Sequence, residues 1–85
     1  MDSYSVFIKP SAVKELEALP PKDRQRVAEK IQALAANPRP VGSEKLSGLQ
    51  QYRLRQGSYR IVYSISDKER GVVVVKIAHR REAYR

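Results

Sequence analysis

The sequence predicts an α+β fold, with a small antiparallel β-sheet and two N-terminal helices packed on one of its faces. Two observations predict this class. Apolar and polar residues alternate, as in half-buried strands, near the N-terminus and between residues 51 and 66, whereas apolar residues between positions 12 and 36 recur at helical spacing. A chain of 85 residues without an internal repeat is predicted to form one domain over residues 1–85, in the order β-α-α-β-β-β.

The first three elements follow from strand alternation and from proline positions. A first strand is predicted over Tyr4–Lys9, and Ser11 can cap a short helix from residue 12 to about residue 19. Pro21 suits the first position of a second helix, because that position needs no backbone N–H. The second helix ends before Pro38, and its apolar stripe should cover the sheet: Val27, Ala28, Ile31, Leu34 and Ala35.

Residues 51–66 are predicted to form a β-hairpin around a two-residue turn at Gly57-Ser58. If Gln56 pairs with Tyr59, the alternation of side chains divides the hairpin into two faces. One face is apolar, with Tyr52, Leu54, Ile61 and Tyr63. The other carries Arg53, Arg55 and Arg60, with Arg55 directly opposite Arg60. Like charges directly opposed in a sheet are destabilising, so this pair is expected to bind something negatively charged.

The last strand is predicted over residues 72–78, after a polar turn at residues 67–71. Its apolar character on both faces predicts a central position in the sheet or cover on both sides. We expect Ser66 to pair with Val72. This register places Lys76 on the arginine face and, two residues beyond Ala78, Arg80 as well.

The charge of the chain is concentrated in its C-terminal part. The net charge is +8, of which residues 1–50 carry +2 and residues 51–85 carry +6. A basic field of this kind favours nucleic acid, an acidic membrane or an acidic protein as the partner. The sequence has no cysteine, no glycine-rich phosphate loop, no metal-ligand cluster and no Ser-His-Asp arrangement. The start of the chain resembles no signal peptide and no apolar run is long enough to span a bilayer, so we expect a cytoplasmic protein without a metal or cofactor.

The C-terminal residues add groups that can move a proton. His79, Glu82 and Tyr84 are the candidates near the arginine face, and Tyr84 could also stack on a base. Arginine cannot act as an ordinary base because its pKa lies above 12.

The segments LSGLQQYRLRQGSYRIVYSI and VVVVKIAHRREAYR resemble the RelE/ParE toxin superfamily, nearest its RelE branch. The resemblance covers essentially the whole chain. It implies the toxin of a type II toxin–antitoxin system, an endoribonuclease that cleaves messenger RNA on the ribosome without metal. In this reaction the ribose 2′-hydroxyl attacks the adjacent phosphate. The resemblance also implies an antitoxin partner, which we expect to be acidic and partly disordered.

The resemblance assigns roles to residues by position. It implies that Arg60 and Arg80 stabilise phosphate charge and that Tyr84 orients the nucleotide or shares the proton transfer. The family's basic pair, often lysine, corresponds to Arg53 and Arg55. The predicted catalytic set is Arg55, Arg60, Arg80 and Tyr84, and the predicted RNA-binding set is Arg53, Lys76 and Arg81.

Three questions stay open on the sequence alone. The general base could be Tyr84, Glu82 or His79. The protein could instead be a ParE-like toxin that inhibits DNA gyrase. It could also be a non-catalytic module that binds RNA or the ribosome.

Overall fold

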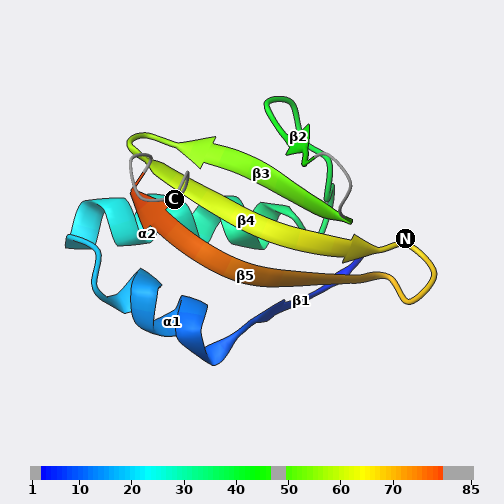
Figure 1. Ribbon diagram of the computed structural model, residues 1–85, viewed down its shortest axis with the longest axis horizontal. Helices are drawn as coiled ribbons and strands as arrows, with labels where there is room; N and C mark the ends of the chain where they lie inside the picture. The colour runs from blue at the N-terminus through cyan, green and yellow to red at the C-terminus, as the bar shows by residue number, and fades with distance from the viewer. Residues whose placement is uncertain (1–2, 47–49, 80–85) are drawn as a thin grey trace.

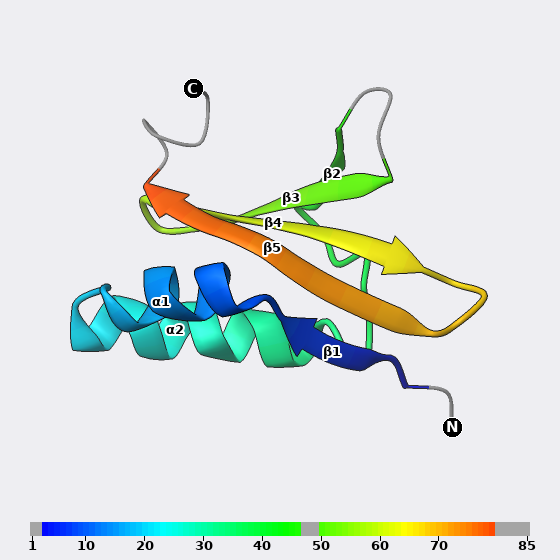
Figure 2. The ribbon, with the colours of Figure 1, turned by 60° about the horizontal axis from the view of Figure 1, so that its bottom comes forward.

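The computed structural model describes residues 3–46 and 50–79. This part of the chain forms two layers, in which both helices lie on one face of a five-stranded sheet (Figures 1 and 2). The predicted α+β class is confirmed. The elements in chain order are β1 (Ser5–Ile8), α1 (Pro10–Glu17), α2 (Pro21–Ala33), β2 (Glu44–Lys45), β3 (Gln51–Gln56), β4 (Tyr59–Ser66) and β5 (Gly71–His79).

The sheet has the strand order β1-β5-β4-β3-β2, and it differs from the prediction in two ways. β1 pairs with β5 in parallel, so the sheet is mixed and not wholly antiparallel. β2 is a two-residue strand beside β3, which the sequence did not predict because two residues carry no alternation pattern. The central position predicted for the last strand is confirmed, since β5 lies between β1 and β4.

Prolines set the start of both helices. α2 begins at Pro21, as predicted. α1 begins at Pro10, two residues earlier than predicted, so Ser11 lies inside the helix. The N-cap of α1 is Lys9, which makes no side-chain hydrogen bond there. Within the described ranges, no helix is long and apolar enough to cross a membrane.

The hydrophobic core lies between the helices and the sheet. Of the predicted stripe of the second helix, Val27, Ile31 and Leu34 are buried, whereas Ala28 and Ala35 are half-buried. The three buried residues pack with Ala12 of α1 and with the helix-facing side chains of β3, β4 and β5: Leu54, Ile61, Tyr63, Ile65, Val72, Val74 and Ile77. The opposite face of the sheet is therefore left for polar and charged side chains.

The β3–β4 hairpin has the predicted register. Gln56 pairs with Tyr59, Leu54 with Ile61, and Arg55 with Arg60. Gly57 has a φ of +59°, the left-handed conformation that glycine adopts most readily.

The β4–β5 register is only partly as predicted. Ser66 pairs with Gly71 and not with Val72. A β-bulge corrects the one-residue offset, because Tyr63 pairs with Val74 while Val62 pairs with Lys76, leaving Val75 as an extra residue on β5. Beyond the bulge the predicted pairs are present. The bulge thus keeps the core residues of β5 on one face while the arginine face retains its predicted register.

A polar cluster ties the loop after α2 to the β4–β5 turn. Arg39 donates two hydrogen bonds to Asp67, with Nη1–Oδ1 and Nη2–Oδ2 distances of 3.0 and 2.8 Å. The hydroxyl of Tyr4 also donates to Asp67 Oδ1, at 2.7 Å. The Arg39 guanidinium lies 5.2 Å from the centre of the Tyr52 ring. The hydrogen bonds from Arg39 and then Tyr4 lower the pKa of Asp67 to about 2.

This cluster predicts a stability change in acid. Because the pKa of Asp67 in the folded protein lies below its ordinary value of 3.8, its contribution to stability is present above that value and is lost as the pH falls toward 2. We expect Asp67→Asn to flatten the dependence of melting temperature on pH in this window. Arg39→Gln should flatten it in part, because the hydrogen bond from Tyr4 remains, and adding Arg39→Gln to Asp67→Asn should flatten it no further. Single variants with the full wild-type slope would contradict this account.

Candidate functional site

The face of the sheet opposite the helices carries two rows of side chains. Directly paired residues on neighbouring strands share a face, so the register defines each row. One row runs from β2 to β5 through Glu44, Arg53, Val62 and Lys76. The next row contains Arg55, Arg60 and Ala78. The predicted grouping of Arg53, Arg55, Arg60 and Lys76 on one face is therefore present.

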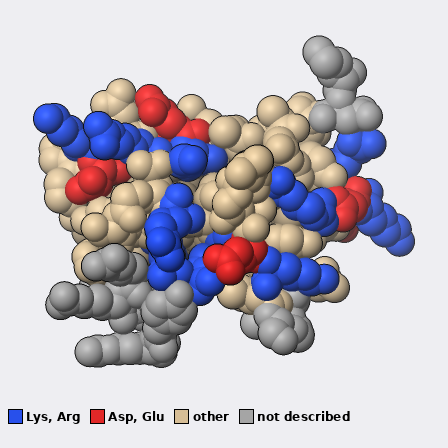
Figure 3. Space-filling view, turned by 90° about the horizontal axis from the view of Figure 1, so that it is seen from above, with Lys and Arg blue, Asp and Glu red and all other residues tan. Residues whose placement is uncertain are grey.

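A cavity of about 300 Å³ opens among the arginines. The described residues that line it are Gly42, Glu44, Arg53, Arg55 and Arg60, and we refer to it as the arginine cavity. Figure 3, seen from above Figure 1, shows Lys and Arg side chains interspersed with acidic ones over the face that it presents. The surface is thus cationic but not uniformly so.

The three arginines of the cavity differ in depth. Arg60 is buried, with 4% of its surface exposed, the Arg53 side chain is 19% exposed, and Arg55 is exposed. Arg55 and Arg60 are direct cross-strand partners, so an anion between them would offset their repulsion. Arginine forks bind phosphate oxygens in pairs and keep their charge at any working pH. The cavity is therefore suited to a phosphate group.

Glu44 is a cavity residue that sequence reasoning did not select. Nη2 of Arg53 donates to Glu44 Oε1 at 3.1 Å, and the Glu44 side chain is 64% exposed. Its place on the arginine face follows from its pairing with Arg53 across β2 and β3. Only recognition of the short strand β2 could have revealed it.

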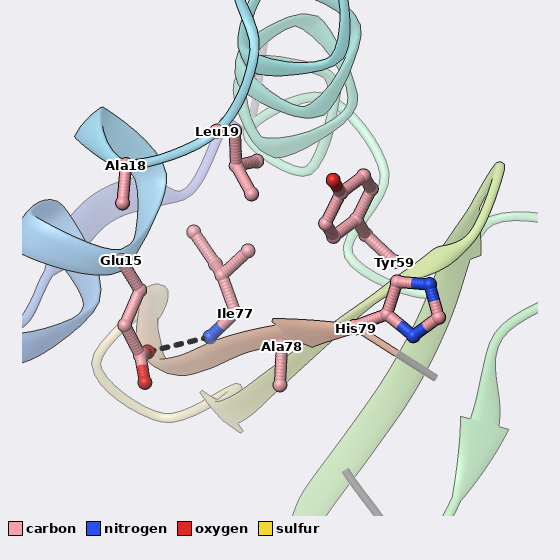
Figure 4. Close-up of a pocket in the computed structure, with 7 residues that line it drawn as sticks. All are labelled: Glu15, Ala18, Leu19, Tyr59, Ile77, Ala78 and His79. Carbon is pink, nitrogen blue, oxygen red and sulfur yellow. Dashed lines mark hydrogen bonds between the residues drawn. The ribbon is translucent and has the colours of Figure 1, made fainter. Parts of the chain in front are cut away.

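Lys76 lies on the arginine face but outside the cavity. Its Nζ is 3.7 Å from Glu15 Oε2 of α1, at the other edge of β5. Glu15 also accepts a hydrogen bond from the backbone N–H of Ile77, at 2.9 Å (Figure 4). Lys76 is thus engaged with the helix that follows β1.

His79 is directed away from the arginines. It pairs with Tyr59, whose side chain packs against the core, so both side chains belong to the helix-facing side. The two rings meet edge to face, with their centroids 5.7 Å apart. Both line a separate cavity of about 320 Å³ between α1 and the end of β5 (Figure 4). The sheet therefore lies between the His79 side chain and the arginine cavity.

The remaining predicted site residues, Arg80, Arg81 and Tyr84, lie outside the described residues, as does Glu82. Their roles stay predictions.

Comparison with known proteins gives a consistent family. The protein-family model described as the ParE toxin of type II toxin–antitoxin system, parDE, matches residues 6–84 of this chain. Toxin RelE of Mycobacterium tuberculosis is 35% identical over 86 residues, covering 96% of this chain and 87% of that protein. Toxin RelG of the same organism is 33% identical over 86 residues, covering 96% of this chain and 97% of that protein.

The fold gives the same result. The crystal structure of the archaeal RelE–RelB complex from Pyrococcus horikoshii OT3 contains a chain that matches with a TM-score of 0.83 and 32% sequence identity. The match covers 92% of this chain and 96% of that chain.

Proposed function

This chain belongs to the ParE toxin family of type II toxin–antitoxin systems, on its RelE-like branch, and we propose that it is an endoribonuclease that cleaves messenger RNA on the ribosome. The observation that carries the proposal is the arginine cavity, where Arg53, Arg55 and Arg60 meet on one face of the sheet. In this proposal the protein acts in the cytoplasm, where messages are translated.

The proposed reaction is an internal transfer at one phosphodiester. The ribose 2′-oxygen attacks the phosphorus, the bond to the 5′-oxygen breaks, and a 2′,3′-cyclic phosphate and a 5′-hydroxyl result. Negative charge builds on the phosphate oxygens in the transition state. A donor already held in place, as the buried Arg60 is, stabilises that charge without having to reorganise, and the exposed Arg55 opposite it adds a second donor. The reaction uses no metal.

An antitoxin would need to neutralise this cavity. The Pyrococcus horikoshii relative was crystallised as a RelE–RelB complex. We propose that this chain binds a comparable partner, which presents acidic side chains to the arginine face and is partly disordered when alone.

Mapping RNA 5′ ends after induction of the protein in cells tests the proposal. Cuts that follow the codon frame of translated messages support ribosome-dependent cleavage. Intact RNA with defects in DNA supercoiling would identify a gyrase inhibitor instead. RNA or ribosome binding with neither effect would identify a non-catalytic module.

The C-terminal residues provide a second prediction. We expect Arg80→Ala and Tyr84→Phe each to reduce cleavage about 10-fold or more, because the first removes a phosphate donor and the second a hydroxyl that orients the nucleotide or shares the proton. Circular dichroism should show an intact fold. A folded double variant that cleaves at the wild-type rate would remove both residues from the site.

A further inference from the structure

We propose that Glu44 is the general base that removes the proton from the ribose 2′-hydroxyl, an inference that rests on the proposed nuclease function. The arginine cavity contains donors for phosphate but needs a group that accepts a proton. Among the described residues that line it, Glu44 is the one with such a group. The guanidinium groups of Arg53, Arg55 and Arg60 stay protonated, and Gly42 has no side chain.

The β2–β3 pairing positions the carboxylate. Glu44 lies directly opposite Arg53, on the same face as the other cavity arginines. Arg53 holds Oε1 at 3.1 Å, and its own side chain is only 19% exposed. A largely buried arginine side chain thus holds the carboxylate of a glutamate whose side chain is 64% exposed and accessible to an incoming nucleotide. A carboxylate has two oxygens, so the bond to Arg53 leaves acceptor capacity for a hydroxyl proton.

The proton balance of the step closes through Glu44 and solvent. Glu44 takes the 2′-hydroxyl proton as the 2′-oxygen bonds to phosphorus and the phosphorus–5′-oxygen bond breaks. The 5′-oxygen gains a proton through solvent, and Glu44 returns its proton to solvent. No co-reactant is consumed.

The alternative role for Glu44 is to neutralise Arg53 when RNA is absent. The two roles predict opposite results for removal of the charge. If Glu44 only neutralised Arg53, its loss would strengthen phosphate binding and leave cleavage equal or faster. If Glu44 is the base, its loss strengthens or preserves binding but slows the chemical step.

The test measures binding and single-turnover cleavage separately, on ribosomes carrying a defined message. We expect Glu44→Gln to cleave about 10²-fold more slowly than wild type, since positioned acid–base groups contribute at least this much. Its affinity for the message should not fall. Glu17→Gln is the matched control, because it makes the same charge change on an exposed residue of α1 and should cleave normally. Formate, a small carboxylate, should restore part of the activity of Glu44→Ala.

The outcomes are distinct. Wild-type or faster cleavage by Glu44→Gln would overturn the proposal and leave Glu44 as a neutralising group. Slow cleavage by both Glu44→Gln and Glu44→Ala, with no rescue of Glu44→Ala by formate, would also overturn the proposal, because this result would assign Glu44 a structural role. If the wild-type protein cleaves no message on the ribosome, the nuclease function itself fails, and the base assignment fails with it.

Discussion

Arg60→Lys is expected to slow single-turnover cleavage about 10²- to 10³-fold, the effect of removing one preorganised donor from a transition state. Arg60 is the most deeply placed arginine of the cavity, with 4% exposure, and it lies opposite Arg55 across β3 and β4. Lysine keeps the positive charge but replaces a planar fork with a single point donor. A fall in the cleavage rate of Arg60→Lys would therefore report the loss of the bidentate geometry and not of the positive charge.

Arg26→Lys is the matched control, because Arg26 is an exposed residue of α2 and should tolerate the same change without loss of cleavage. The melting temperature of each variant separates chemistry from folding. If Arg60→Lys is unstable, Arg55→Ala tests the cavity at an exposed position, because it removes that donor outright. Stable variants at both positions that cleave at the wild-type rate would contradict the assignment of the cavity.

Ile61→Ala is expected to cost about 2–5 kcal/mol of the free energy of unfolding, the usual range for this truncation in a core. Ile61 is fully buried in β4, paired with Leu54 on one side and Ile77 on the other. Small domains have total stabilities of about 5–15 kcal/mol, so the loss is a large fraction of the whole. Urea unfolding should show a lower midpoint with an unchanged slope.

Two comparisons make the stability result specific. Val41→Ala removes methyl groups from a residue that is 101% exposed, so its unfolding midpoint should not move. Ile61→Val should cost about 0.5–1.5 kcal/mol. Because Ile61 and Arg60 point to opposite faces of β4, Ile61→Val should retain cleavage while Arg60→Lys retains the core. An Ile61→Ala variant as stable as wild type would contradict the packing described for the core.

The elements with a strong local pattern could be predicted from the sequence. A two-residue turn at Gly57-Ser58 allows few strand registers, so the sequence predicted the β3–β4 register and with it the pairing of Arg55 and Arg60. The stripe of α2 repeats at helical spacing, and its larger residues are buried as expected. These features depend on neighbours within a few residues, which a sequence displays directly.

The register at the second turn could not be predicted in the same way. A run of consecutive valines packs acceptably in either register, so alternation does not distinguish them. The position of the bulge at Val75 depends on how the side chains of β5 pack against β4 and the helices. Likewise, the parallel pairing of β1 with β5 joins the two ends of the described chain and leaves no local mark.

The sequence by itself determined the fold class, the basic C-terminal part and the arginine face, because each follows from composition or from short-range alternation. Only the tertiary structure decided which proton-accepting group of the described residues lies beside the arginines of that face. It brought Glu44 to the arginines through a two-residue strand and turned His79 to the helix side through its pairing with Tyr59. The physical reason is that a side chain's face depends on the register between strands, and that register is set by packing across the whole sheet.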